Sequence, residues 1–265
     1  MNKTFKVIFS KTRGALVAVN EAAKTTSRAS VKTAVAGVCA ALLSVPAMAA
    51  EFADDYCKDG VNCVVADKTV EGTGSVVRLD KKDGIQSITI KNSTISNTPF
   101  ELRGSQNISV SDTVFTGLAS GKSSSFAIFA HKGDKTVDVT NETATKVELN
   151  NVTFKDNTVS YGSLFVYDKT KLHMKGGEFV KNVTTDIGGG AMIKSGTIVF
   201  EDVLFQDNVA RNKSGFVAGG AVYVDITTSI KQNGANAVGD VTFKLTKDMA
   251  YTGNRIDSPF EGKEN

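Results

Sequence analysis

The chain has 265 residues, of which 41% are hydrophobic and 22% are charged, with 24 Gly, 3 Pro and no Trp. These numbers suit one sizeable domain with a hydrophobic core, and they exclude a disordered chain or a polytopic membrane protein. Of the 31 Lys/Arg and 28 Asp/Glu, residues 1–49 contain seven and one, so residues 50–265 contain 24 and 27 and carry −3. The formal net charge of +3 therefore belongs to the N-terminus, and no basic patch indicates nucleic-acid binding.

The N-terminal 49 residues have the order of charged, apolar and small residues found in a secretory signal. The apolar run TAVAGVCAALLSVPAMA at 33–49 follows Arg28 and Lys32. This run is shorter than the roughly 20 residues of a membrane span, although an N-terminal membrane anchor is the alternative. We expect a helical or disordered leader that the Sec machinery exports and that is cleaved after Ala49. The cleavage site comprises Ala47, Ala49 and Ala50.

A second block, MNKTFKVIFSKTRGALVAVNEAAK at 1–24, precedes this ordinary signal. It resembles the extended signal peptide region of type V secretion proteins, the autotransporters and related exoproteins of Gram-negative bacteria. The residues that carry the resemblance are Met1-Asn2-Lys3, Phe5-Lys6-Val7-Ile8, Lys11-Thr12-Arg13-Gly14, Val17-Ala18-Val19, Glu21, Ala23 and Lys24. The resemblance implies slow export to the periplasm and leaves the role of the mature domain open.

Residues 50–73 form a polar lead-in segment that contains the sequence CKDGVNC. Cys39 lies in the signal, which leaves Cys57 and Cys63 as a closely spaced pair in an oxidising compartment. Such a pair predicts a small disulfide loop. The alternative, a metal site, needs two further ligands, and the two histidines, His131 and His173, are far away in the sequence.

From residue 74 to 265 the chain alternates short apolar pieces with Gly, Asn, Asp, Ser and Thr, which is the pattern of β-strands. The longer pieces lie at 75–79, 88–95, 108–115, 147–154, 172–179, 198–205 and 241–245. Shorter pieces lie between them: TPFELRG, SSFAIFA, GSLFVYD, GGAMIKS and GGAVYVD. No stretch of the mature chain has a sustained helical period.

The longer pieces recur at a nearly fixed interval, which indicates stacked coils. Their last apolar residues are Ile95, Phe115, Phe154, Phe179 and Phe205, at separations of 20, 39, 25 and 26 residues. The 39-residue step is one coil with an inserted loop, with 132–146 as the candidate insertion, or two coils. We predict an all-β fold, a right-handed parallel β-helix of the pectin-lyase-like solenoid type, over 74–265. An antiparallel sandwich is the alternative, but it gives no reason for the recurring offset from Phe to Asn.

The recurring Phe-x-x-Asn sequence has a structural interpretation. The Phe side chains point inward, and Asn at a corner tolerates a left-handed backbone and bonds nearby backbone groups. Glycine pairs let the chain turn back into the next strand with unusual dihedral angles. A row of ligand-binding Asn side chains is the functional alternative. The repeat residues are Phe154, Asn157, Phe179, Asn182, Gly189, Gly190, Phe205, Asn208, Gly219 and Gly220.

FKDN, FVKN, FQDN, GGAM and GGAV at 147–225 also resemble the polymorphic outer-membrane protein repeat, although Met192 departs from the usual aliphatic residue. That family has β-helical autotransporter passengers, and the resemblance implies adhesion. Other β-helices are lyases, hydrolases or esterases, which need convergent carboxylates or an Arg/Lys base with metal-binding acids. We find no such cluster, because Asp156, Asp202 and Asp207 lie at corners and His173 faces solvent without a partner nearby in the sequence.

The sequence ends at YTGNRIDSPFEGKEN without the alternating ten-residue strands of a membrane barrel. We interpret the chain as a truncated passenger whose last piece, VTFKLTKDMAY, begins an incomplete coil. The sequence therefore predicts a non-enzymatic adhesin fragment without cofactor or metal, which binds a host or bacterial surface glycan or protein, or itself. It would be periplasmic alone, and at the cell surface or outer membrane if joined to a translocator barrel. The alternatives are a β-helical carbohydrate-active enzyme and an inert remnant.

Overall fold

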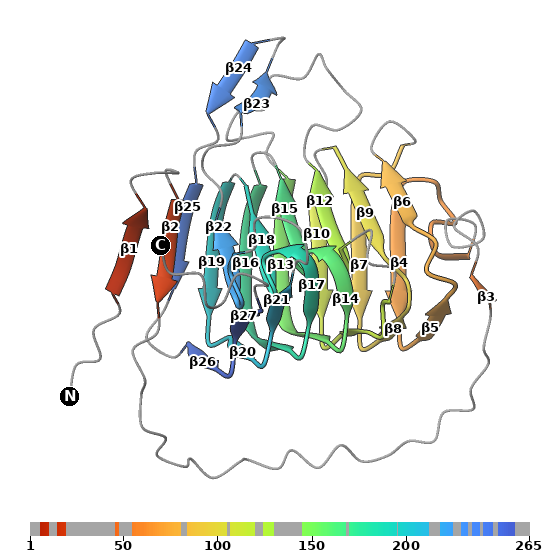
Figure 1. Cartoon of the computed structure of the whole chain (residues 1–265). Coiled ribbons are helices and arrows are strands. Elements are labelled where there is room, and N and C mark those ends of the chain that lie inside the picture. Colours follow the sequence, from red (N-terminus) through yellow and green to blue (C-terminus); the bar gives the residue numbers. More distant parts are fainter. Residues whose placement is uncertain are drawn as a thin grey trace.

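Parallel strands stacked along one axis form the body of the protein (Figure 1). The computed structural model describes residues 6–10, 15–19, 46–47, 55–80, 84–104, 107–119, 124–129, 145–167, 170–194, 196–211, 218–224, 229–232, 235–238, 241–245 and 249–257. One circuit of the chain around the axis is called a coil below. Each strand pairs in parallel with its counterpart in the next coil, so the predicted all-β parallel β-helix is confirmed.

The largest sheet forms the long face of the solenoid, and a bend divides it lengthwise. Its first half contains β4 (Asn62–Ala66), β7 (Ser87–Lys91), β10 (Asn107–Ser111), β13 (Thr145–Lys155), β16 (Thr170–Val180), β19 (Gly196–Glu201) and β25 (Val241–Leu245). Its second half contains β5 (Thr69–Gly72), β8 (Thr94–Ser96), β11 (Val114–Thr116), the later parts of β13 and β16, β20 (Leu204–Gln206) and β26 (Ala250–Thr252). Seven successive coils therefore contribute to this face.

Two further sheets close the circuit. The second face contains β6 (Val77–Asp80), β9 (Phe100–Arg103), β12 (Phe126–Phe129), β15 (Leu164–Tyr167), β18 (Ala191–Ile193) and β22 (Val222–Val224). The third face contains β14 (Thr158–Tyr161), β17 (Val183–Ile187), β21 (Val209–Arg211) and β27 (Arg255–Asp257). The third face is shorter than the others because, among the described residues, its first strand belongs to the fourth coil.

The predicted alignment of the longer pieces is the register of the long face. Ile95 pairs with Phe115, Phe115 with Phe154, Phe154 with Phe179, and Phe179 with Phe205. The 39-residue step is therefore a single coil, whose additional residues lie between β12 and β13. The predicted insertion at 132–146 ends two residues too late, because Thr145 and Lys146 already belong to β13.

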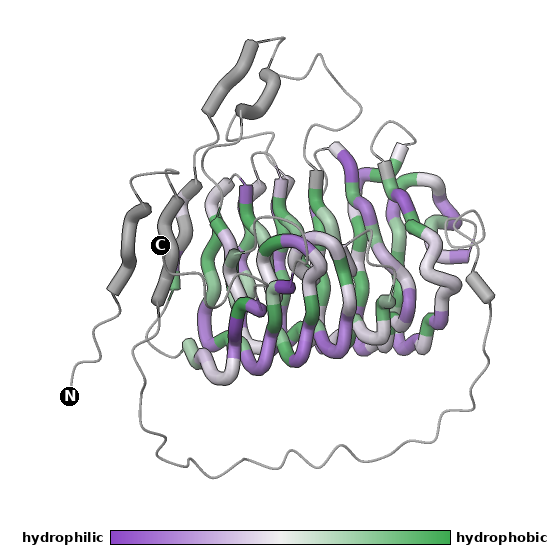
Figure 2. The backbone as a smooth tube through the Cα atoms, in the orientation of Figure 1, coloured by the Kyte–Doolittle hydropathy of each residue, from purple (hydrophilic) through white to green (hydrophobic). Residues whose placement is uncertain are grey.

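Aromatic rings stack along the interior of the long face. Phe115, Phe154, Phe179 and Phe205 have centroid separations of 5.1, 4.9 and 4.6 Å, and their planes lie within 12° of parallel. Tyr251 continues the stack at 5.2 Å from Phe205. Stacking of this kind adds about 0.5–1.5 kcal/mol per pair to the free energy of burial. The rings point inward because hydrophobic and hydrophilic residues alternate along the strands, as Figure 2 shows.

The first coil begins before the predicted boundary at residue 74. Strand β4 pairs with β7 and β5 pairs with β8, in the register of the later coils. Residues 62–72 thus belong to the solenoid, and the polar lead-in is shorter than predicted. Their composition is polar because only alternate residues of these strands, such as Cys63, Val65 and Val70, are buried.

Of the leader, the structure describes only residues 6–10, 15–19 and 46–47, and these stretches are extended rather than helical. Within it, β1 (Lys6–Ser10) and β2 (Ala15–Val19) pair antiparallel, and β3 (Pro46–Ala47) pairs with β5. Strands β1 and β2 contain Val7, Ile8, Val17 and Val19, and β-branched side chains favour extended backbone over helix. A second antiparallel pair, β23 (Ser229–Gln232) and β24 (Ala235–Val238), lies between β22 and β25.

The sequence predicted that VTFKLTKDMAY only begins a coil, but the last described coil contains three paired strands. Strands β25, β26 and β27 pair with β19, β20 and β21 respectively. The coil therefore reaches from the long face around to the third face. Residues 258–265 lie outside the described residues.

Candidate functional site on the outer faces of the solenoid

The Asn residues of the Phe-x-x-Asn repeat point into the interior and bond to one another. Asn157, Asn182 and Asn208 are at most 1% exposed. Each amide nitrogen Nδ2 donates to the carbonyl oxygen of the Phe in the preceding coil at 2.8–3.1 Å. It also donates to Oδ1 of the Asn in the next coil at 2.8–3.0 Å, so that Asn254 completes the row. This Asn ladder satisfies buried backbone groups, and the amides of Asn157, Asn182 and Asn208 are buried, away from any ligand in solvent.

The left-handed residue at this bend is the one before the Asn, and the prediction that placed it at the Asn is wrong. Asp156, Lys181 and Asp207 each have a φ of 54°, whereas the ladder Asn residues are not among those with positive φ. The physical reason is that the Asn side chain must turn inward to reach the neighbouring coils. The reversal of chain direction therefore falls on the preceding residue, whose side chain projects outward. Within the long face, Asp67, Asn92, Asp112, Asn151, Gly176 and Asp202 form a second row of left-handed residues.

The Asn ladder has the same extent as the third face. Asn157, Asn182, Asn208 and Asn254 directly precede the four strands of that sheet. In the earlier coils, Thr98 and Leu118 follow the left-handed residue instead. The Leu118 N–H donates to Asn157 Oδ1 at 3.1 Å and so begins the ladder.

The glycine pairs are needed mainly because the backbone passes close to the neighbouring coil, and less because of unusual dihedral angles. Gly219 has a φ of 70°, but Gly189, Gly190 and Gly220 are not among the residues with positive φ. A Cβ on Gly189 would collide with the Gly220 carbonyl oxygen. A Cβ on Gly190 would lie 2.7 Å from the Ala221 carbonyl oxygen and 3.0 Å from the Phe205 ring. The chain thus passes directly over the aromatic stack at this corner.

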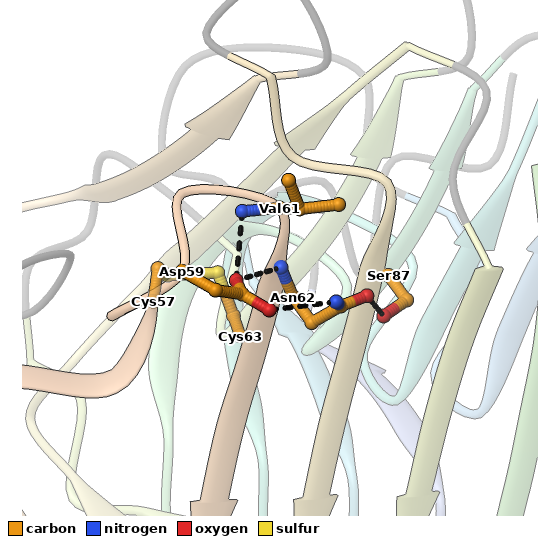
Figure 3. Close-up of a disulfide and its surroundings, with 6 residues drawn as sticks. All are labelled: Cys57, Asp59, Val61, Asn62, Cys63 and Ser87. Carbon is orange, nitrogen blue, oxygen red and sulfur yellow. Dashed lines mark hydrogen bonds between the residues drawn. A yellow bond between two sulfur atoms is a disulfide. The ribbon is translucent and has the colours of Figure 1, made fainter.

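Cys57 and Cys63 form a disulfide at the first coil, and both are buried (Figure 3). Within the loop that they close, an Asp59 carboxylate oxygen accepts from the backbone N–H groups of Val61 and Asn62 at 2.8 and 2.6 Å. The predicted cleavage residue Ala47 lies in β3, while Ala49 and Ala50 lie outside the described residues.

The outer side of the long face contains charged residues in register. His173 lies between two carboxylates, with Nδ1 3.5 Å from Glu148 Oε2 and Nε2 3.3 Å from Glu201 Oε2. Lys175 Nζ is 3.5 Å from the other oxygen of Glu201. The prediction that His173 faces outward is correct, since 38% of its side chain is exposed. Its partners come from the neighbouring coils, 25 and 28 residues away, so no local sequence pattern contained them.

The outer side of the second face has a different character. Residues in register from coil to coil form one line, which we call the outer row: Arg78, Glu101, Ala127, Phe165, Met192 and Tyr223. At its first end, Glu101 is only 13% exposed in its side chain and pairs with Arg78 and Arg103 at 3.1 and 2.7 Å. At its far end the row is apolar and aromatic.

This aromatic end forms a small cluster separate from the interior core. Phe165 and Met192 are buried although they point away from the interior, and Tyr167, Ile187 and Tyr223 pack against them half-buried. Around this cluster, Tyr161 stacks on Phe165 at 5.5 Å, the ring centres of Phe165 and Tyr167 are 6.0 Å apart, and Lys194 Nζ lies 5.7 Å from the centre of the Tyr167 ring. Tyr161 is 39% exposed. This surface was not predicted from the sequence, although the shorter strands, once aligned, have large apolar residues on both their inward and their outward sides.

The described residues contain no group of three or more His, Cys, Asp or Glu side chains that could hold a metal ion. Within the same residues no helix is long and apolar enough to cross a membrane. The segment VARNKSGFVA at 209–218, which we expected to carry specificity, falls largely outside the described residues, at 212–217.

Comparison with known proteins places the leader in a family. Residues 1–50 match the family described as the Extended Signal Peptide of Type V secretion system. No curated protein and no solved structure matches the chain. The match covers both the N-terminal block and the ordinary signal, so the chain carries an export signal of type V secretion. Together with the fold, this defines an exported protein with a parallel β-helical domain of the kind found in passengers.

Proposed function

We propose that the chain is a non-enzymatic adhesive passenger domain that binds surfaces through the aromatic end of its outer row. The observation that carries the proposal is the cluster of Tyr161, Phe165, Tyr167 and Tyr223 on the outside of a β-helix with a type V export signal. Tyrosine supplies a large apolar area with a polar tip and is enriched at binding surfaces. The partner is a glycan or protein of a host or bacterial surface, or a second cell that displays the same chain.

The surrounding charges support binding rather than catalysis. Lys194 lies over Tyr167, and the Arg78–Glu101–Arg103 group continues the same side of the rod. Cations beside exposed aromatic rings are common at interfaces, where Arg and Tyr supply much of the binding energy. The resemblance of the FKDN, FVKN and FQDN repeats to the polymorphic outer-membrane protein repeat supports the same adhesive role.

In this proposal the compartment depends on the translocator. The chain alone reaches the periplasm, and it reaches the cell surface when a barrel in the outer membrane displays it. Display on a barrel therefore tests adhesion directly. We expect cells that display residues 50–265 to aggregate or to bind surfaces more strongly than cells with an empty barrel.

The outer row provides the variants for this experiment. Replacing Tyr167 and Tyr223 with Ala should reduce aggregation or binding to near that of the empty barrel. The matched control replaces Thr89, an outward residue of β7 on the long face, with Ala. Equal adhesion by the two variants, or no adhesion by the parent chain, would contradict the proposal.

The absence of enzymatic activity needs its own test. The purified chain should release no new reducing ends or unsaturated products from pectins, glucans and host glycosaminoglycans. Release by the parent chain would replace the adhesin proposal with a carbohydrate-active enzyme.

A further inference from the structure

We propose that the Cys57–Cys63 disulfide is a redox latch of the first coil. The coil closes only when the two thiols have been oxidised, and the bond is not reduced again until the coil opens. The chain therefore completes its first coil after it has left the reducing cytosol, and residues 1–50 match a signal that directs this export. The proposal concerns the folding of the domain and is independent of adhesion.

Both sulfur atoms lie in the hydrophobic core. Cys57 is 6% exposed and Cys63 is 1% exposed, and both belong to the same buried cluster as Ile88 of β7. Tyr56, the neighbour of Cys57 in the chain, packs against this cluster. Exchange between thiols and disulfides requires a thiolate to reach one of the sulfur atoms, so access controls its rate. The closed coil prevents this access, and the bond must therefore form while the coil is open.

The loop that the disulfide closes has a structure of its own. Besides the two backbone N–H groups that bond Asp59, the Asn62 side chain donates through Nδ2 to the second oxygen of this carboxylate at 2.8 Å. The Gly60 N–H donates to the Cys57 carbonyl oxygen at 2.8 Å. None of these bonds involves another coil. Because the cysteines are only six residues apart, oxidation of the open chain fixes this loop before it meets the rest of the solenoid.

The same loop contacts the second coil (Figure 3). The Val61 carbonyl oxygen accepts from the Gln86 N–H at 2.8 Å, and the Ser87 hydroxyl donates to Asn62 Oδ1 at 2.6 Å. Asn62 is also the first residue of β4, which pairs with β7 from this point on. A fixed loop thus places the start of β4 on β7. With two free thiols, the segment before Asn62 has more conformations to lose, and closure is therefore less favourable.

The chemical step balances with a small-molecule or protein disulfide as the oxidant. The thiolate of one cysteine attacks a sulfur of the oxidant, forms a mixed disulfide and releases one thiolate. The second cysteine then attacks the sulfur of the first, and the other half of the oxidant leaves as a thiolate. The chain thus loses two electrons and two protons, and the oxidant, which gains them, becomes two thiols. The cytosol reverses this exchange, whereas oxidising compartments favour it.

Hydrogen exchange tests whether closure needs the bond. The starting protein is the full chain with Cys39→Ser, so that only Cys57 and Cys63 react. It is compared after oxidation by oxidised glutathione and after refolding with a reductant. We expect amide exchange in β4 and β5 to be at least ~10-fold faster in the reduced protein, and that in β13 and β16 to be unchanged. Equal exchange in the two forms, or an equal loss of protection in β13 and β16, would overturn the proposal.

Reduction of the folded protein tests the reverse direction. Dithiothreitol is added to the oxidised chain, and alkylation of the new thiols followed by mass spectrometry gives the rate of reduction. We expect this rate to be at least ~10-fold lower in buffer than in urea, because reduction waits for the coil to open. A rate in buffer as high as that in urea would show that the sulfur atoms are accessible in the closed coil, and the latch would then be wrong.

A pair of serine variants tests the contact between the loop and the second coil. Ser87→Ala removes the bond to Asn62 but keeps both cysteines, and it should speed the reduction in buffer. The matched control is Ser109→Ala, at an exposed serine of β10, which should reduce at the rate of the parent. Equal rates for the two variants would contradict the role of the loop in closing the coil.

Discussion

At the corner before the third face, two adjacent residues have different roles in the bend. The residue with positive φ reverses the chain, and the Asn after it holds the coils together from inside. The left-handed residue differs between coils (Asp156, Lys181, Asp207 and Gly253), because its side chain projects outward and only its backbone is constrained. The Asn is the same in each of these coils because its side-chain amide bonds three or four backbone and side-chain groups of the neighbouring coils.

Among these four residues, Lys181 is the one for which a left-handed backbone costs the most free energy. A left-handed backbone costs a non-glycine residue about 1–2 kcal/mol, and less for Asn. Lys181→Asn should therefore raise the free energy of unfolding by ~0.5 kcal/mol, measured by urea denaturation. The control Lys155→Asn changes an exposed strand residue and should give no gain. A loss of stability in Lys181→Asn would contradict the assignment.

The ladder itself should be more sensitive than a bend residue. Asn208→Leu leaves the Asn182 N–H and the Phe179 carbonyl without partners in the interior, and each such group costs about 1–3 kcal/mol. We expect a loss of ~3 kcal/mol or more in urea unfolding. Asn254→Leu, at a half-buried position, should cost about half as much, since the Asn254 side chain is itself only partly withdrawn from water. Similar losses at both positions would argue against a role for burial.

At this scale the sequence predicted the inward Phe residues but misplaced the left-handed residue. The inward residues could be found because burial imposes alternation, which a single strand shows. The left-handed residue could not be found in this way. Asp156, Lys181, Asp207 and Gly253 share a backbone conformation, but their side chains have nothing in common that a sequence pattern could show.

Among the elements, the Cys57–Cys63 loop shows how a short segment closes the first coil. The pKa of Asp59 lies below its ordinary value, chiefly because its carboxylate accepts from the backbone N–H of Asn62, and then from the Asn62 side chain and the Val61 N–H (Figure 3). A lowered folded-state pKa means that the ionised carboxylate stabilises the fold above the ordinary pKa. This contribution is lost as the pH falls through the folded-state pKa.

Asp59→Asn should therefore destabilise the chain at pH 7, and the difference from the parent should shrink below about pH 4. Thermal unfolding of both proteins at pH 7 and at lower pH measures it. Asp55→Asn, at an exposed carboxylate outside the loop, is the control. A difference that stays constant with pH would show that the Asp59 charge is not involved.

The charged and aromatic elements of the outer surface were predictable only after the register was known. Glu148 faces His173 once the pieces at 147–154 and 172–179 are aligned. The same alignment of the shorter strands brings Phe165, Met192 and Tyr223 together. Sequence patterns define each strand separately, whereas contacts across coils require the stacking order.

Over the whole molecule, stability should vary along the axis. Strands β13 and β16 have neighbours on both sides, whereas β26 and β27 have one described neighbour each. In repeat structures each coil is stabilised mainly by its nearest neighbours. Amide hydrogen exchange should therefore be slowest in β13 and β16 and fastest in β26 and β27. Uniform protection, measured by mass spectrometry of peptides, would indicate a single cooperative unit instead.

The coil order and the stacking of the rings could be predicted from the sequence because the same offset returns in each coil. The ends of the insertions in the two longer coils were harder to predict. Phe115 and Phe154 are 39 residues apart and Phe205 and Tyr251 are 46 apart, yet both pairs are in register. Polar insertions carry no periodic signal of their own, so their ends are uncertain from sequence alone.

Both additional lengths lie at the same corner, between the second face and the long face, after β12 and after β22. The strands on either side of each addition are in register with their neighbouring coils, because the ring and the amide of the next coil pack against local partners whatever the number of residues between. In Figure 1 the β23–β24 pair accordingly projects beyond the stacked strands. We therefore expect this corner to accept a foreign epitope of comparable length while the rings of the interior keep their register.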